Sequence, residues 1–415
     1  TPDWLPREIT TMITLSKHKD LQRLRRHAVA AQGLLGNAAF AKGKAGAIQA
    51  IERLGYVQLD TISVVERAHN HVWHSRVPGF TPDMSNELLE SREIYEYWAH
   101  AAAYLPMSEF RFSEPDKASV RAGTLRKQRT RDPKMKAKVL QRIREEGPMS
   151  AQDMERDQPG PKRKSTGWWD WKPGKKALEM LYLEGDLMVS SRAGFRKTYD
   201  LTERVLPNHV DTRRPTAEEW AEHLLNQQLR CHGIVTEAGI SYGRRDRKLR
   251  AAIKILLEER LAARQLEVFQ LLNGEQFYGP ADVLEQPLPR GSDTLKILSP
   301  FDNAVIQRKR LMSLFGFDYT IECYVPEGKR RYGYFVLPLL YRDEMVGRMD
   351  CKAYRDTGVL SVKALFIETP EEKQQEVCDA LAKSLVGFAR FQGCQEVRVE
   401  NVLPEGLMGR LQRLL

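Results

Sequence analysis

The run GYVQLDTI, residues 55–62, carries a glutamine and an aspartate two positions apart in an otherwise apolar stretch. Side chains alternate along an extended strand, so we expect Gln58 and Asp60 to project to one side and their neighbours to the other. A carboxylate can deprotonate a water molecule or stabilise a positive charge, and an amide can orient the reacting group. The alternative is an edge strand with one solvated face, which this spacing alone does not exclude.

Three histidines follow closely, at positions 69, 71 and 74 in the run RAHNHVWHSR. Histidine is a common metal ligand, but no carboxylate completes a recognisable zinc signature around these positions. We therefore expect packing or ligand-facing roles for them and no metal site.

The composition limits the classes of protein that fit. A chain of 415 residues has room for three or four small domains. A formal net charge of +10 favours a polyanionic partner, with nucleic acid first. Five scattered cysteines without a Cys-x-x-Cys pair fit reduced thiols in a cytosol. Because no apolar stretch is long enough to span a membrane, we expect a soluble, cytoplasmic protein without a membrane partner.

A helix-turn-helix pattern recurs along the chain. A helical run ends at a glycine, passes through a short apolar step and resumes with helix-start residues in three segments, residues 47–60, 139–157 and 226–243. Ser150 is expected to cap one of the resuming helices, and Thr236 is expected to cap another. Repeated units of this kind predict tandem helix-turn-helix domains.

Strand-like runs follow the second and third units. A helix expected from about Lys175 to Glu184 precedes two such runs, which meet around Arg192 to Gly194, and residues 247–280 repeat this order. Helix-turn-helix followed by a hairpin describes a winged helix. The expected α+β fold therefore has three winged-helix domains, at residues 9–130 with the Gln-x-Asp strand, 131–212 and 213–294.

From about residue 295 the pattern changes to short alternating runs, at 317–326, 331–341 and 359–368. The helical run 371–393 follows them. Residues 295–415 are therefore predicted to form an antiparallel β-domain closed by a helix.

Basic residues cluster beside these units. Residues 121–144 carry ten Lys or Arg with Asp132 as the single acid, and RRDRKLR occupies residues 244–250. One such run usually marks a solvated helix face, but several beside predicted DNA-reading units favour DNA contact. The tryptophans of GWWDWKPGKK, Trp168, Trp169 and Trp171, are expected mainly in a core. The cations expected to bind phosphates are Lys172, Lys175 and Lys176 at a helix start, Arg192, Arg196 and Lys197 on a wing, and Arg308, Lys309 and Arg310.

Four stretches together resemble one protein family. Residues 54–76, 96–107, 167–187 and 298–350 are similar to the YcaQ family of bacterial winged-helix DNA glycosylases, to which the AlkZ and AlkX enzymes are related. The resemblance extends from about residue 20 to about residue 400. It implies a monofunctional glycosylase, without lyase activity, that excises N7-alkylated purines and unhooks DNA interstrand crosslinks. It implies no metal and no cofactor, and an open lesion site.

The family's catalytic motif is Gln-apolar-Gln or Gln-apolar-Asp, and this sequence has Gln58-Leu59-Asp60. An N7-alkylguanine is already cationic, so it leaves without being protonated and one carboxylate suffices. Asp60 would activate water or stabilise the oxocarbenium ion, while Gln58 positions the water or sugar. Glu66, His69 and His71 are expected to border the lesion site.

Two other functions fit the coarse pattern. A winged-helix transcriptional regulator without catalytic activity is the main alternative, although regulators usually dimerise and no sustained heptad pattern is present. A metal nuclease is third, because the Pro-Asp pairs of EPDK and TPDM are not followed by a convincing Glu-x-Lys. The expected protein is a monomeric bacterial repair enzyme that acts on double-stranded DNA and associates with the nucleoid when bound to it.

Overall fold

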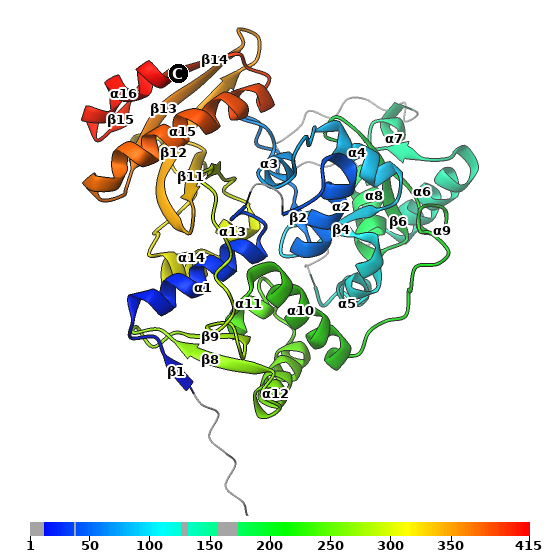
Figure 1. Cartoon of the computed structure of the whole chain (residues 1–415). Coiled ribbons are helices and arrows are strands. Elements are labelled where there is room, and N and C mark those ends of the chain that lie inside the picture. Colours follow the sequence, from blue (N-terminus) through cyan, green and yellow to red (C-terminus); the bar gives the residue numbers. More distant parts are fainter. Residues whose placement is uncertain (1–11, 37–38, 126–131, 157–172) are drawn as a thin grey trace, which may run out of the picture. The chain divides into compact units, whose positions relative to one another are not determined.

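The computed structural model describes residues 12–36, 39–125, 132–156 and 173–415 (Figure 1). The chain divides into two compact units. The first combines Thr1–Thr81 with Ala217–Leu415, and the second is Pro82–Thr216. These boundaries differ from those of the four expected domains, and that fourfold division stays a prediction. In sequence terms, the second unit is an insertion into the first.

The N-terminal part of the first unit leads directly to the Gln-x-Asp motif. Its elements are β1 (Met12–Thr14), α1 (His18–Ala31), α2 (Gly43–Leu54), β2 (Val57–Gln58) and α3 (Ala68–His74). Gly55 ends α2 in the left-handed conformation with φ +78°, and a Cβ there would lie 2.4 Å from the Gln227 side chain. Only glycine accepts that backbone angle without strain in so little space. The turn into β2 is thereby fixed.

A helix-turn-helix with a hairpin follows after residue 216. It consists of α10 (Ala217–His232), α11 (Glu237–Ile240), α12 (Arg247–Ala262), β8 (Leu266–Gln270) and β9 (Gln276–Pro280). Thr236 caps α11 by accepting a hydrogen bond from the Gly239 N–H at 3.0 Å, as the sequence predicted. Asp246 caps α12 in the same way through the Leu249 N–H at 2.9 Å. β1 extends the hairpin into a three-stranded sheet by pairing parallel to β8.

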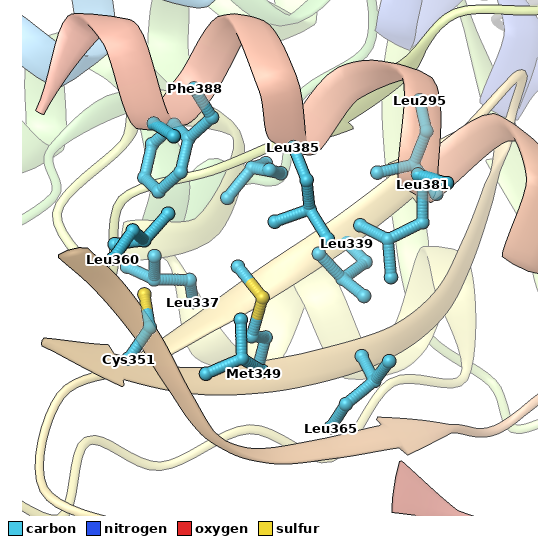
Figure 2. Close-up of a cluster of buried hydrophobic side chains, with 14 of the residues drawn as sticks. Leu295, Leu337, Leu339, Met349, Cys351, Leu360, Leu365, Leu381, Leu385 and Phe388 are labelled. Carbon is cyan, nitrogen blue, oxygen red and sulfur yellow. The ribbon is translucent and has the colours of Figure 1, made fainter. Parts of the chain in front are cut away.

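The last part of the first unit is built on a larger sheet. Its elements are β10 (Leu295–Ile297), α13 (Asn303–Ile306), α14 (Arg308–Phe315), β11 (Val336–Tyr341), β12 (Glu344–Tyr354), β13 (Val359–Ile367), α15 (Glu371–Phe391), β14 (Glu396–Val399), β15 (Val402–Leu403) and α16 (Met408–Leu414), with 3₁₀ turns at Glu327–Lys329 and Glu405–Leu407. α15 lies across one face of the sheet, and its apolar side chains, including Leu381, Leu385 and Phe388, pack on Leu339 and Met349 (Figure 2).

Two details of this sheet differ from the sequence prediction. β10 to β13 are antiparallel, but β14 and β15 both pair parallel to β13. The predicted antiparallel pairing is confirmed for β10 to β13, and the strands after α15 depart from it because α15 returns the chain over the sheet and a helical crossover of this kind permits parallel pairing. The run 317–326, predicted as a strand, forms no strand, and its Glu322 side chain accepts hydrogen bonds from the N–H groups of a later part of the same loop.

The second unit contains helices around two hairpins. Its elements are α4 (Asp83–Glu90), β3 (Ile94–Trp98), β4 (Ala102–Pro106), the 3₁₀ segment Met107–Ser113, α5 (Glu114–Arg121), α6 (Pro133–Glu146), β5 (Met149–Ser150), α7 (Asp153–Arg156), α8 (Pro173–Glu184), β6 (Leu187–Ala193), β7 (Arg196–Leu201) and α9 (Thr202–Val205). Ser150 and Asp153 hydrogen-bond reciprocally at the start of α7, so the predicted cap is confirmed.

A buried lysine is the unusual feature of the core of this unit. The Lys117 side chain is only 3% exposed, and its Nζ lies 3.6 Å from the centre of the Phe110 ring and 5.1 Å from that of Tyr97. In the described part of the chain its ammonium group has no hydrogen-bond acceptor. Burial lowers the pKa of Lys117 to about 7.

One order of elements occurs three times along the chain: helix, short strand, two helices, hairpin. It runs from α2 to β4, from α6 to β7 and, with an isolated bridge at Val235 as the short strand, from α10 to β9. This is the order of a winged helix. The predicted α+β class is confirmed. Among the described residues, no helix combines the length and the apolar character needed to cross a bilayer.

Candidate active site

Asp60 lies just beyond the end of a very short strand. β2 contains only Val57 and Gln58, and the Asp60 Oδ1 accepts a hydrogen bond from the Ile62 N–H at 2.8 Å. An aspartate that binds the N–H two residues ahead forms a local turn, which competes with strand pairing. The predicted strand therefore ends early, and the two polar side chains differ in environment: Gln58 is buried and Asp60 is half-buried. An edge strand with one solvated face does not describe this pair.

The environment of Asp60 alters its proton affinity. Partial burial raises the pKa of the Asp60 carboxyl, and hydrogen bonds from the Ile62 and Thr61 N–H groups oppose this effect. Burial is the larger influence, so the carboxylate is a stronger proton acceptor than an exposed aspartate. Such a group is suited to act as a general base near neutral pH.

Residues of the loop between α14 and β11 lie close enough to Asp60 for its charge to raise their pKa values. Burial raises the pKa of the Cys323 thiol, and Asp60 raises it further. The pKa of Tyr324 is raised by burial, then by Cys323 and Asp60. The Tyr324 side chain is nevertheless 79% exposed. The neighbourhood of the carboxylate thus contains an accessible aromatic ring.

An acid side chain shapes this loop. Glu322 accepts hydrogen bonds from the N–H groups of Arg331, Tyr332 and Gly333 at 2.9, 2.8 and 3.1 Å. The Arg330 guanidinium lies 4.9 Å from the centre of the Tyr334 ring. Sequence reasoning missed these residues because the alternation in 317–326 resembled a strand. The available signal was the basic and aromatic run KRRYGY that follows.

Two of the three residues expected to border a lesion, Glu66 and His71, make contacts that stabilise the fold. Glu66 Oε1 accepts from the Arg67 N–H at 2.9 Å and from Asn70 Nδ2 at 3.0 Å, which ties it to the start of α3. His69 is buried, with 6% of its surface exposed. A place for Glu66 and His69 beside a lesion stays a prediction.

His71 lies in the core of the first unit. It is fully buried, its Nε2 is 2.9 Å from the Ile297 carbonyl oxygen, and its ring centre is 5.1 Å from that of Phe388. Burial lowers the pKa of His71 to about 4. A side chain in this position stabilises packing, and the geometry argues against contact with a lesion.

His74 completes the histidine group and is half-buried. It stacks on Phe391 with ring centres 3.7 Å apart. Burial lowers its pKa to about 3. Searched over the described residues, the structure holds no cluster of three His, Cys, Asp or Glu that could bind a metal ion.

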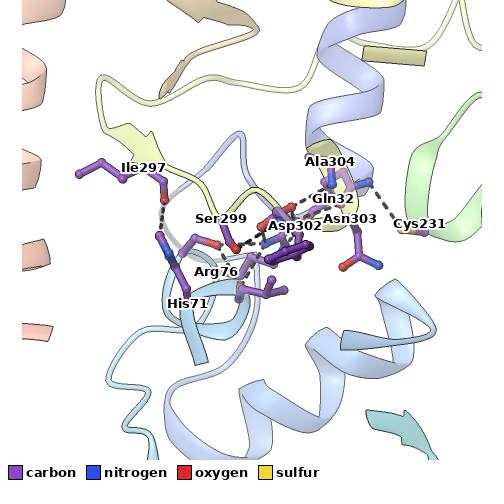
Figure 3. A network of polar contacts seen from close by, with 12 residues as sticks. Gln32, His71, Arg76, Cys231, Ile297, Ser299, Asp302, Asn303 and Ala304 are labelled. Carbon is purple, nitrogen blue, oxygen red and sulfur yellow. Dashed lines mark hydrogen bonds and ion pairs between the residues drawn. The ribbon is translucent and has the colours of Figure 1, made fainter. Parts of the chain in front are cut away.

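A buried polar network holds the segment that leads into the motif. Arg76 and Asp302 form a two-pronged ion pair, with both distances 2.7 Å and both side chains without exposed surface (Figure 3). Asp302 also caps α13 through the Ala304 N–H at 2.9 Å. The adjacent Asn303 donates from Nδ2 to the Tyr56 carbonyl at 3.1 Å. Because Tyr56 directly precedes β2, this network fixes the backbone that carries Gln58.

The expected phosphate-binding residues of the second unit fall into two groups. Lys175 is exposed and Lys176 is half-exposed at the start of α8, and Arg196 is exposed on β7. Arg192 is buried, and its Nη2 lies 2.7 Å from a carboxylate oxygen of the equally buried Glu96.

Lys197 contacts the same carboxylate, with its Nζ 2.9 Å from Glu96 Oε1. Contact of Arg192 or Lys197 with phosphate would therefore break an existing ion pair. Lys172 and the tryptophans at 168, 169 and 171 lie outside the described residues.

The three basic residues of α14 also differ in exposure. Lys309 is exposed, whereas Arg308 donates to the Val305 and Pro300 carbonyls, each at 2.6 Å. Arg310 is buried and donates to the His232 carbonyl at 3.1 Å, and burial lowers its pKa to about 10. Lys309 alone of this trio points to solvent.

Comparison with known proteins relates the chain to a protein family and to a solved structure. A family model described as "DNA glycosylase AlkZ-like" matches residues 51–391. Among solved structures, the chain is similar to the Streptomyces sahachiroi DNA glycosylase AlkZ, with 17% sequence identity and a TM-score of 0.58. That match covers 92% of this chain and 99% of the other, and at this identity it shows a common fold. The family match includes Gln58, Asp60 and the loop around Tyr324.

Proposed function

Because the chain belongs to the AlkZ-like DNA glycosylase family, we propose that it hydrolyses the N-glycosidic bond of N7-alkylated purines in duplex DNA, with Asp60 as the catalytic group. The family resemblance noted in the sequence is confirmed by the same match. The enzyme is a DNA glycosylase, and the proposal concerns its lesion, its residues and its mechanism. The observation that carries the proposal is the half-buried, proton-attracting carboxylate of Asp60 beside an exposed aromatic ring.

The chemistry needs one carboxylate. An N7-alkylpurine carries a positive charge, so breaking its bond to C1′ releases a neutral base and leaves an oxocarbenium-like sugar. Asp60 stabilises this cation by its charge and takes a proton from the water that attacks C1′. The products are the free base and an abasic sugar. No amine attacks C1′ in this scheme, so no lyase activity is expected.

Gln58 has a positioning role in this mechanism. It lies two residues before Asp60, on the backbone that Asn303 holds through the Tyr56 carbonyl. Its amide can donate to and accept from a water molecule or a sugar oxygen at the same time. Substitution of Gln58 should therefore lower the excision rate less than substitution of Asp60.

The same site is proposed to unhook interstrand crosslinks. A base tethered to the opposite strand cannot swing into a closed pocket, so a crosslink glycosylase needs an accessible site. The 79% exposure of Tyr324 beside the carboxylate supports that access. Crosslinked N7-alkylguanine has the same charged leaving group as a monoadduct, and the proposed chemistry does not change.

DNA binding in the second unit is assigned to the cations that face solvent. Lys175, Lys176 and Arg196 remain candidates for phosphate contact, and Lys309 does so in the first unit. Charge reversal at Lys175 and Lys176 should weaken binding to all duplex sequences and flatten its salt dependence. An unchanged salt slope would remove α8 from the interface.

The decisive experiment measures base release. Purified protein is incubated, with a chelator present, with a duplex that contains one N7-methylguanine, and alkali-labile breaks are counted. The wild-type chain should produce breaks, and Asp60→Asn should slow them by about two to four orders of magnitude. Asparagine keeps an oxygen that can accept from the Ile62 N–H, so this variant removes the charge and preserves the turn.

A matched control separates chemistry from net charge. Asp356 is exposed in the turn between β12 and β13, and Asp356→Asn makes the same chemical change away from the site. It should excise like the wild type. Unchanged excision by Asp60→Asn would remove Asp60 from the mechanism, and sequence-specific binding without any base release would match a transcription regulator instead.

A further inference from the structure

The exposed side of α12 is a basic surface that the proposed active site does not use. Arg247, Arg250 and Lys254 recur at helical spacing on one stripe of the helix, and Lys248 lies beside them. All four are exposed, and we refer to them as the α12 basic face. The opposite side of the helix is apolar and buried, through Leu249, Ala252, Ile253, Leu256 and Leu257.

Nearby acids do not neutralise this face. Across the described ranges of the chain, Arg247, Lys248 and Lys254 have no carboxylate within 4.0 Å. Arg250 donates to the Arg244 carbonyl at 2.9 Å, which restrains it on the same side of the helix. Like charges three or four positions apart on a helix destabilise it slightly. A surface that keeps them together without acids is suited to a polyanionic partner.

The charge on the exposed side of α12 changes sign along the helix. The basic residues occupy the first half of α12, and the exposed acids Glu258 and Glu259 occupy the second half. At the far end of the helix, Arg260 is paired with Glu222, in contrast to the N-terminal cations. Only the first half is therefore complementary to phosphate.

The position of α12 in its helix-turn-helix also favours DNA contact by the N-terminal half of the helix. α12 is the second helix of the α11–α12 helix-turn-helix, which α10 precedes, and the β8–β9 hairpin follows it as a wing. The hairpin turn carries Leu272, which is 79% exposed. In helix-turn-helix proteins the second helix meets the duplex with its N-terminal residues.

We propose that the α12 basic face binds the phosphate backbone of duplex DNA, giving the protein a contact with DNA beyond its active site. This inference rests on the proposed function, because it takes DNA as the substrate. The contact is independent of sequence and damage, since arginine and lysine address phosphates here. The α12 basic face would therefore bind undamaged duplex as well as duplex that contains a lesion.

The test uses the full chain and an undamaged 20-base-pair duplex over a range of salt concentrations. In the double variant Arg247→Ala, Lys254→Ala, two phosphate contacts are lost, so the slope of log K against log salt should flatten by roughly 2 and binding at about 0.1 M salt should weaken roughly 10- to 100-fold. The charge-preserving swap Arg247→Lys, Lys254→Arg should retain the wild-type slope. Both positions are exposed, and circular dichroism checks that the variants fold.

A control in the same unit removes two charges elsewhere. Lys383 and Arg390 are exposed on α15, and the double variant Lys383→Ala, Arg390→Ala has the same loss of net charge. It should bind duplex DNA with the wild-type slope. Equal weakening by the α12 and α15 variants would show an effect of net charge alone and overturn the proposal. An α12 variant with wild-type binding would also overturn it.

Two further outcomes are distinguishable. If the α12 variant loses binding to vesicles that contain anionic lipid but not to the duplex, the face serves a membrane and the proposal is wrong. If the wild type binds undamaged duplex but releases no N7-methylguanine, the proposed chemistry fails, and the salt slopes still decide whether α12 contacts DNA.

Discussion

Replacing the buried Lys117 by methionine should stabilise the protein, and the gain should depend on pH. The ordinary lysine pKa is 10.5, and in the folded chain it is lowered to about 7 by burial. At 1.36 kcal/mol per pH unit, this difference corresponds to a cost of about 5 kcal/mol for holding the ammonium group charged in the core. Contact with the aromatic rings offsets about 2 kcal/mol. We expect Lys117→Met to raise the free energy of unfolding by about 2 to 4 kcal/mol at pH 6.

The direction of the pH dependence follows from proton binding. Below about pH 7 the lysine is charged in both the folded and the unfolded chain, so the full cost is present. Between about 7 and 10.5 the unfolded chain binds more protons than the folded chain, and the stability of the wild type therefore rises with pH. The advantage of the methionine variant should shrink over this range and vanish above it.

The assay is urea-induced unfolding followed by circular dichroism at pH 6 and at pH 9.5. Lys138 is an exposed lysine of α6 in the same unit, and Lys138→Met is the control that should change stability little at either pH. A Lys117→Met variant that is no more stable than the wild type at pH 6, or a gain of equal size at both pH values, would refute the reasoning.

Three further predictions concern the site and its support. Asp302→Asn leaves Arg76 charged and unpaired in the core, so urea unfolding should show a loss of about 3 to 5 kcal/mol, whereas a double replacement of both residues by apolar ones should recover part of it. Because burial raises the pKa of Asp60, the rate of base release should begin to fall at a higher pH than the ordinary aspartate value of about 3.9 predicts; a rate that is flat down to that value contradicts Asp60 as the base. Tyr324→Ala should weaken binding of lesion-containing duplex roughly tenfold if the ring stacks on a base, and Tyr324→Phe should not, as fluorescence titration would show.

Local signals made part of this structure predictable. The cap at Thr236 depends on residues within four positions. The α8 helix, which is expected from about Lys175 and begins at Pro173, depends on apolar residues that repeat within the helix itself. The Gln-x-Asp motif was also visible in the sequence. In each case the residues that determine the feature are neighbours in the chain, so pattern and propensity suffice.

The remainder depends on contacts between distant residues. Arg308 and Arg310 belong to a basic run, but their burial is decided by the elements that pack over α14. Glu96 appears in the sequence as an ordinary strand residue, and only the fold brings Arg192 to it. The loop at Tyr324 had the alternation of a strand, and backbone bonds to Glu322 across about ten residues give it another shape.

The pairing of Arg76 with Asp302 also affects the order in which the nascent chain can fold. The two residues are separated by 226 positions, and the whole second unit lies between them in sequence. At about 5 to 20 residues per second, a ribosome takes roughly 10 to 45 seconds to synthesise that interval. The inserted unit is complete before the discontinuous one, whose guanidinium must stay hydrated until its carboxylate emerges. During translation the segment that carries Gln58 and Asp60 is therefore among the last parts of the protein to become rigid.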